Sequence, residues 1–173
     1  FARSSWHYGR GVAYASMENK ESALKELAAI ERLEPEVDEI FMGNVYPAKS
    51  LIGIAKSLLR GEIAFRSGAM AAAVTSFEQA VAMQDALPYT EPPFWYYPTR
   101  QSLGAALLAD GRAAEAQLVF EADLEQYPMN GWSLYGLTEA LNAQGHTAPA
   151  EAARQRFETV WQFSDVTLSS SVL

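Results

Sequence analysis

The chain has 173 residues, enough for one domain or for a short run of stacked helical hairpins. Hydrophobic residues make up 49% of it and charged residues 20%, which is typical of a folded globular protein and not of a disordered one. The 21 acidic side chains outnumber the 13 basic ones, the net charge is -8, and no basic block occurs, so we expect neither nucleic acid nor an acidic membrane surface as a partner.

Cysteine usage and the first residues bear on location. The chain contains no Cys, which excludes disulfides, thiolate catalysis and thiolate metal sites but leaves the compartment open. No run approaches the roughly 18 apolar residues that a membrane-spanning helix requires, and residues 1–7 lack the pattern of a secretion signal. We expect a soluble, cytoplasmic chain. Because it starts at Phe1 inside an aromatic-rich helical stretch, we also expect it to be the C-terminal part of a longer protein.

Hydrophobic periodicity, with Gly and Pro at the breaks, predicts eight helices. In chain order their expected bounds are Trp6–Met17, Lys20–Leu33, Ala48–Ser67, Met70–Met83, Pro98–Ala109, Ala113–Gln126, Gly131–Gln144 and Pro149–Phe163. Gly68, Gly111 and Gly145 stand at turns, where a left-handed residue ends the first helix of a hairpin. The polar residues from Ser164 onward are expected to lie over the end of the last helix or to be disordered.

A 34-residue period relates the later helices. Gly111 and Gly145 are 34 residues apart, as are Ala116 and Ala150. Within a copy, a Gly is followed by Gly seven residues on, by Ala twelve on, and by an aromatic residue or Leu sixteen on. The copies comprise Gly61, Gly68, Ala73, Phe77 and Ala80; Gly104, Gly111, Ala116, Phe120 and Pro128; and a degenerate first set of Gly11, Tyr14, Ala23, Leu27, Ile30 and Pro35. Small residues let paired helices approach closely, and Leu27, Phe77, Leu107 and Phe120 are expected to fill the seam.

This spacing resembles the tetratricopeptide repeat, in which each repeat is a pair of antiparallel helices. The resemblance implies an all-α superhelix, or solenoid, of about four hairpins in a single domain over residues 1–173. The repeats fall at about 4–37, 54–87, 97–130 and 131–163. Two stretches exceed the period and are expected as insertions, at about 36–47 and 87–96, and long irregular connections are often functional. In the last copy Trp132 and Gly136 are four residues apart as in the family, but Gly145 follows two residues late, so we expect a longer or shifted first helix there.

The second insertion carries a distinctive motif. Glu91, Pro92, Pro93, Trp95, Pro98 and Arg100 match an E-P-P-x-W-x-x-P-x-R signature found near the end of some larger bacterial tetratricopeptide-repeat proteins whose biochemical role is unassigned. In one interpretation, Trp95 and the tyrosines seal the gap that the insertion opens, while Glu91 or Asp85 pairs with Arg100. In the other, Tyr89, Glu91 and Trp95 form the rim of a ligand site, because Trp, Tyr and Arg dominate binding hot spots.

The resemblance also implies a concave groove lined by the first helix of each hairpin. Carried over to this sequence, the groove residues are Tyr8, Glu62, Arg66, Arg100, Gln101, Trp132, Tyr135, Glu139 and Asn142. This mixture of aromatic, charged and amide groups suits a peptide whose backbone and charges need partners. The alternative is a solvated face with no ligand.

We found no pattern that indicates catalysis, a cofactor or a metal. His7 and His146 each lack a second His or a carboxylate at metal-ligand spacing, and His7 is interpreted as packing against a helix outside the chain. The acidic run Glu31, Glu34, Glu36, Asp38 and Glu39 is interpreted as a solvated connection. No P-loop, dinucleotide fingerprint or nucleophile elbow occurs.

Three functional hypotheses follow. The leading one is a non-catalytic scaffold that binds a protein or peptide through its groove. A second is self-assembly into a homo-oligomer through the repeat ends, with Trp6 and His7 at one end and Trp161 and Phe163 at the other. The third is that enzymatic or metal-binding chemistry lies upstream of this segment.

Overall fold

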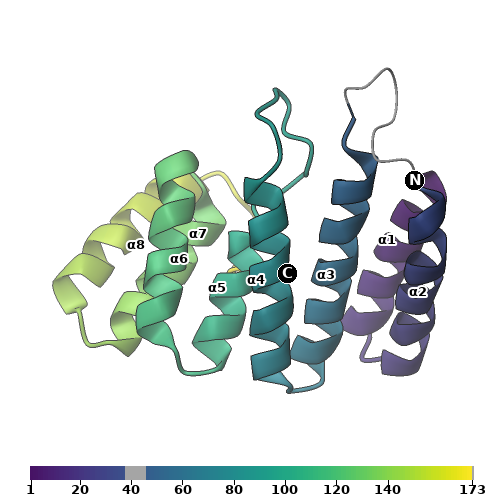
Figure 1. Cartoon of the computed structure of the whole chain (residues 1–173). Helices are drawn as coiled ribbons and strands as arrows, with labels where there is room; N and C mark the ends of the chain where they lie inside the picture. The colour runs from purple at the N-terminus through teal and green to yellow at the C-terminus, as the bar shows by residue number, and fades with distance from the viewer. Residues whose placement is uncertain (38–45, 173) are drawn as a thin grey trace. The chain divides into compact units, whose positions relative to one another are not determined.

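The computed structural model describes residues 1–37 and 46–172, and these residues form eight α-helices and one short 3-10 helix (Figure 1). The predicted all-α class is therefore confirmed. Most of the first expected insertion, about 36–47, lies outside the described residues, as do Asp38 and Glu39 of the acidic run. The chain divides into two compact units, Phe1–Thr99 and Arg100–Leu173, each of which is described by itself. The grouping of all four hairpins into one superhelical domain stays a prediction.

The first unit contains two antiparallel hairpins (Figure 1). Its helices are α1 (Ala2–Ser16), α2 (Lys20–Leu33), η1 (Glu34–Glu36), α3 (Ala48–Arg66) and α4 (Met70–Asp85). The second unit contains α5 (Arg100–Ala109), α6 (Ala113–Gln126), α7 (Gly131–Ala143) and α8 (Thr147–Trp161). The bounds of α2 and α6 coincide with the predicted ones, and the other helices differ by a few residues at one or both ends. The largest difference is at α1, which begins four residues before the predicted Trp6.

All four hairpins turn in the same way. In each, a backbone N–H after the turn donates back to a carbonyl five residues earlier: Asn19 to Tyr14 at 2.8 Å, Ala69 to Ala64 at 2.9 Å, Arg112 to Leu107 at 2.9 Å, and His146 to Leu141 at 3.0 Å. This bond belongs to the turn that ends a helix with a left-handed residue. Gly68, Gly111 and Gly145 supply that residue with φ of 74° to 76°, as predicted, and Glu18 supplies it in the first hairpin with φ of 58°.

The repeat glycines are sites of close helix approach. A Cβ atom at Gly61 would lie 2.4 Å from the ring of Phe77, and one at Gly104 would lie 2.3 Å from the ring of Phe120. In both copies the partner stands sixteen residues on, as the repeat spacing predicted. Phe120 also lies against Gly136, where a Cβ would be 2.2 Å away, so one ring contacts the first helices of both hairpins in the second unit. The predicted seam residues Leu27, Phe77, Leu107 and Phe120 are all buried.

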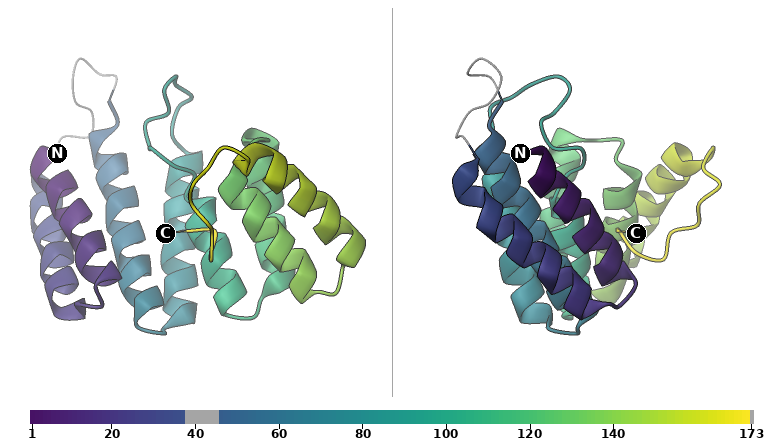
Figure 2. Two further views of the ribbon diagram at one scale, coloured as in Figure 1. Left: turned by 180° about the vertical axis from the view of Figure 1, so that it is seen from behind. Right: turned by 90° about the vertical axis from the view of Figure 1, so that its right-hand side faces the viewer.

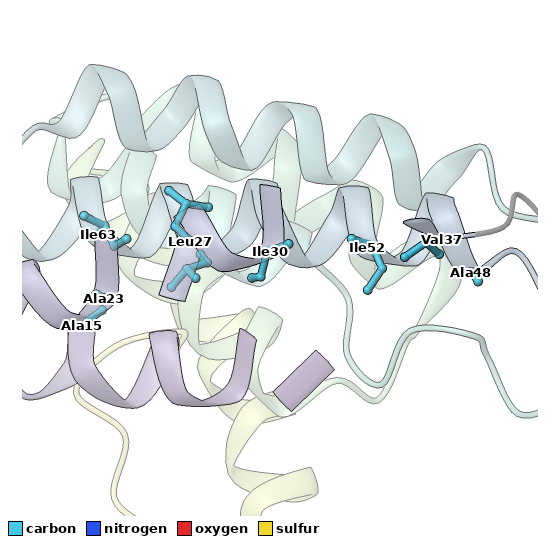
Figure 3. Close-up of a cluster of buried hydrophobic side chains, with 9 residues drawn as sticks. Ala15, Ala23, Leu27, Ile30, Val37, Ala48, Ile52 and Ile63 are labelled. Atoms are coloured by element: carbon cyan, nitrogen blue, oxygen red, sulfur yellow. The ribbon is translucent and has the colours of Figure 1, made fainter. Parts of the chain in front are cut away.

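The core of the first unit lies where α1, α2 and α3 meet (Figure 3). The cluster consists of small and branched side chains: Ala15, Ala23, Leu27, Ile30, Val37, Ala48, Ile52, Leu59 and Ile63. Two ion pairs tie α2 and η1 to α3: Lys56 with Glu34 of η1 at 2.5 Å, and Arg60 with Glu31 of α2 at 2.6 Å. The described members of the acidic run thus include two carboxylates paired with α3, because that helix brings two cations beside the end of α2.

The residues after α8 fold back within the second unit. Figure 2 shows this segment, drawn in yellow, running from the end of α8 toward α5. Its beginning lies over the end of α8, as one of the two predictions for this stretch had it, because the Trp161 indole N–H donates to the carbonyl of Val166 at 2.7 Å. Near its other end, Ser171 is 2% exposed.

Candidate peptide-binding surfaces

The nine predicted groove residues are distributed over both units. In the first unit, Tyr8 belongs to α1, and Glu62 and Arg66 belong to α3. In the second unit, Arg100 and Gln101 belong to α5, and Trp132, Tyr135, Glu139 and Asn142 belong to α7. All nine therefore lie on the first helices of hairpins, but their surroundings differ.

Tyr8 packs against the 87–99 connection of its own unit. Its ring lies edge-on to the ring of Trp95, with 5.6 Å between the centroids, and its hydroxyl lies 3.1 Å from the hydroxyl of Tyr96. Burial raises the pKa of Tyr8 well above its ordinary value, and the neighbouring Tyr97 and Tyr96 raise it further. The groove hypothesis did not anticipate this cover, since it treated the connection as separate from α1.

Further contacts hold the second half of the 87–99 connection. The ring of Phe94 lies 5.5 Å from that of Tyr46, which in turn lies 5.2 Å from the ring of Phe1. At the end of α4, the Gln84 amide donates to the carbonyl of Tyr97 at 3.0 Å. The Gln84 side-chain oxygen accepts from both the backbone N–H and the hydroxyl of Thr99, each at 2.7 Å. These bonds fix the chain just before α5, which begins at Arg100 and not at the predicted Pro98.

The three predicted rim residues differ in exposure and do not form one group. Trp95 is half-buried against Tyr8, as the gap-sealing interpretation describes. Tyr89 and Glu91 are exposed, and the Tyr89 hydroxyl donates to the Glu91 carboxylate at 2.6 Å. That hydrogen bond, with the charge of Glu91, raises the pKa of Tyr89. The pairing of Arg100 with Glu91 or Asp85 stays a prediction.

Arg66 borders a hollow in the first unit. The hollow holds about 320 Å³ and lies between the α1–α2 turn and the end of α3. Its lining combines an apolar floor with polar and charged side chains: Ala15, Ile63, Glu18, Lys20, Arg66 and Ser67. Arg66 is fixed from its own helix by an ion pair with Glu62 at 2.7 Å, so two predicted groove residues are brought together here.

A buried carboxylate, Glu26, joins α2 to α1 in the first hairpin. Glu26 lies 2.6 Å from His7 Nδ1 and 3.1 Å from the Arg10 guanidinium. The Arg10 guanidinium also lies 4.2 Å above the Trp6 ring and donates to the Tyr14 hydroxyl at 3.1 Å. His7 thus has a partner within the hairpin. Sequence reasoning missed it because His7 and Glu26 lie 19 residues apart on different helices, outside the short spacings that were searched for metal ligands.

A buried polar network in the second unit joins α5, α6 and the start of α7. The Gln101 amide donates to Asn130 at 3.1 Å, and Asn130 donates to Asp123 at 2.7 Å. The Ser133 hydroxyl donates to the same Asp123 oxygen at 2.5 Å. Burial raises the pKa of Asp123, while the hydrogen bonds from Ser133 and Asn130 and the charge of Arg100 act in the opposite direction. Gln101, predicted to face a ligand, is instead buried and part of this network.

The four predicted groove residues on α7 differ in how far they are exposed. Trp132 lies 5.5 Å from the ring of Trp161, and Tyr135 lies 5.6 Å from the ring of Phe157, so both are half-buried against α8. Burial, followed by the charge of Glu139, raises the pKa of Tyr135. Glu139 and Asn142 are exposed, as expected of residues that could meet a partner.

No family model, curated protein or solved structure matches this chain. In the described ranges, no group of three or more His, Cys, Asp or Glu side chains is arranged to hold a metal ion. None of the helices in the described part of the chain combines the length and apolar character needed to cross a bilayer.

Proposed function

We propose that this chain is a non-catalytic scaffold of tetratricopeptide-like hairpins that binds a segment of another protein on the first helices of its hairpins. The shared turn hydrogen bonds and the matching Gly–Phe contacts of two copies support the repeat on which this proposal depends. We also propose that the chain is related to the bacterial proteins that carry the E-P-P-x-W-x-x-P-x-R signature. We further propose that it is cytoplasmic.

The hollow beside Arg66 is the observation that carries the proposal. Its volume of about 320 Å³ is at the lower end of the range for ligand pockets, enough for one or two side chains. Lys20 and Arg66 line the hollow together with the carboxylate of Glu18, and Glu62 pairs with Arg66 from outside the lining. An acidic side chain of a bound segment would meet Lys20 and compete with Glu62 for Arg66, and the apolar side chains of Ala15 and Ile63 would accept its methylene groups.

Affinity capture with the full chain as bait tests the proposal. The Arg66→Glu variant reverses the charge in the hollow, so a partner captured by the parent chain should be lost. Arg60→Glu is the matched control, because Arg60 belongs to the same helix, also pairs with a glutamate and does not line the hollow. Circular dichroism checks that both variants fold. Equal capture by the parent and by Arg66→Glu would overturn the assignment of this surface.

Self-assembly is the second candidate, and exposed aromatic side chains favour it. Phe163 is 93% exposed and Trp6 is 55% exposed, whereas Trp161 packs against Gly131 and Trp132 in its own unit. If Phe163 forms a contact between copies, light scattering should show a mass that rises with concentration and no longer does so in Phe163→Ser. A constant monomer mass for the parent chain would exclude this candidate.

A further inference from the structure

Residues 164–172 are tied to α8 at one end and to α5 near the other, by one hydrogen bond each. The segment leaves α8 where the Trp161 indole N–H donates to the Val166 carbonyl at 2.7 Å, and near its other end the Ser171 hydroxyl donates to the Gln101 carbonyl at 3.3 Å. Between these contacts it is irregular and forms no helix. A non-helical segment of the chain thus crosses from the end of α8 to a predicted groove residue of α5.

The acceptor on α5 is the main-chain carbonyl of Gln101, which is held in place by contacts that do not involve residues 164–172. A helical carbonyl keeps one lone pair after its hydrogen bond within the helix, so the Gln101 carbonyl can accept a second donor. The Gln101 side chain is fixed by Asn130, which also caps α7 by accepting from the Trp132 backbone N–H at 3.2 Å. A donor at this point therefore meets a preorganised acceptor.

The position of Ser171 selects for a small side chain. Ser171 is 2% exposed, whereas Thr167 and Ser169 are exposed and Leu168 is half-buried. Serine or threonine supplies the hydroxyl donor in little space. A carboxylate there would be buried and would face a carbonyl oxygen, which is also an acceptor, at a high cost in free energy.

The segment has few buried side chains, and part of its polar bonding is internal. Ser164 accepts from the Val166 N–H at 3.2 Å, and Ser170 accepts from the Val172 N–H at 3.4 Å. Segments with few buried apolar contacts open at low free-energy cost. The surface beneath can therefore be vacated without unfolding the helices.

Resting on the proposed scaffold function, we propose that residues 164–172 are a displaceable internal occupant of the α5 surface. The partner segment that competes for this surface is non-helical, like residues 164–172, and carries serine or threonine at the position of Ser171. If the internal segment covers the surface in about nine molecules of ten, the apparent Kd of a competing segment rises about tenfold.

The test uses the full chain and a fluorescent peptide with the sequence of residues 164–172. Ser171→Glu should release the internal segment, so the peptide should bind this variant about tenfold more tightly than the parent in fluorescence anisotropy. Ser169→Glu is the matched control, because it adds the same charge two residues away at an exposed position and should bind like the parent. A scrambled peptide should bind none of the variants.

Trp161→Phe provides a second route to release, because it removes the donor to Val166 but keeps an aromatic ring against Trp132. It should give a smaller gain in peptide affinity, and it decides the result if Ser171→Glu does not fold.

Hydrogen exchange in the parent should show slowed exchange within residues 164–172. Exchange at the rate of an unstructured peptide would overturn the internal occupant. Failure of the peptide to bind folded release variants would overturn the α5 surface. Neither result bears on the hollow at Arg66, whose capture experiment is separate.

Discussion

Each unit covers an equivalent residue of its first helix with a segment of its own, but the two covers differ in chemistry. Tyr8 and Gln101 both stand three residues before the first glycine of their repeat. In the first unit, aromatic rings of the 87–99 connection pack on Tyr8. In the second unit, a serine hydroxyl from residues 164–172 meets the main chain of Gln101. The contact in the first unit is made mainly by apolar area, and the contact in the second unit mainly by a hydrogen bond.

This difference determines how firmly each segment is held. Burying apolar area contributes about 25 cal/mol per Å², so a large half-buried side chain such as Trp95 contributes more than the net 0.5–1.5 kcal/mol of a typical hydrogen bond. The 87–99 connection should therefore behave as part of the fold of the first unit. The 164–172 segment should exchange between bound and released states.

The largest expected effect concerns two buried seam residues, Phe77 and Phe120. Phe120→Ala should cost about 3–5 kcal/mol, because it removes a fully buried ring from between two helices. Phe77→Ala should fall at the lower end of that range, since Phe77 lies against one repeat glycine, Gly61, whereas Phe120 lies against Gly104 and Gly136. Urea unfolding followed by circular dichroism measures both. An equal cost would contradict the view that Phe120 joins two hairpins.

The seam was predictable from sequence because its signals are local. Gly at a turn and small residues opposite Phe at fixed spacing describe a helical hairpin wherever they occur, so the helices, the turns and the buried Phe77 and Phe120 could be predicted. The groove residues depend on contacts between distant segments. Tyr8 meets Trp95 and Gln101 meets Ser171 only after the chain has folded back, and one serine in a run of three gives no signal that it is the buried one.

The next largest effect concerns the polar network beneath the cover of the second unit. Asp123→Ala should cost about 1–3 kcal/mol, because it leaves the buried Ser133 hydroxyl without its acceptor and removes one of the two acceptors of the Asn130 amide. Leu124→Ala removes an adjacent buried side chain without touching the network and serves as the comparison. A double-mutant cycle with Ser133→Ala should show coupling for Asp123 and none for Leu124.

The raised pKa of Asp123 also predicts a pH dependence. The unfolded state loses its proton near pH 3.9, about the ordinary aspartate value, and the folded state loses it at a higher pH. The contribution to stability is therefore fully present below the unfolded pKa and falls as pH rises through the folded pKa. In Asp123→Asn this fall should be absent. The free energy of unfolding of Asp123→Asn relative to the parent should then increase with pH across the acidic range, and a constant difference would contradict the raised pKa.

The cover of the first unit should respond to loss of its central aromatic side chain. Trp95→Ala should cost about 1–2 kcal/mol, less than a fully buried ring, because Trp95 is half-buried. It should also raise the rate of hydrogen exchange in residues 87–99 while the helices keep their protection. Tyr89→Ala is the control, because Tyr89 is exposed and should leave both measurements unchanged. Unchanged exchange in Trp95→Ala would show that Gln84 and Phe94 hold the connection without it.

The smallest expected effect concerns the hydrogen bond between the Tyr8 and Tyr96 hydroxyls, as distinct from the packing of their rings. Tyr96→Phe removes the bond to the Tyr8 hydroxyl and keeps the aromatic contacts, so it should cost about 0.5–1.5 kcal/mol, at the lower end because the pair is near solvent. Tyr8→Phe should cost the same and add nothing when combined with Tyr96→Phe, since both remove one bond. Tyr89→Phe, which breaks a bond to Glu91 within the exposed part of the connection, should be neutral. Additive costs for Tyr8→Phe and Tyr96→Phe would mean that the hydroxyls act separately, and the cover of the first unit would then rest on its rings alone.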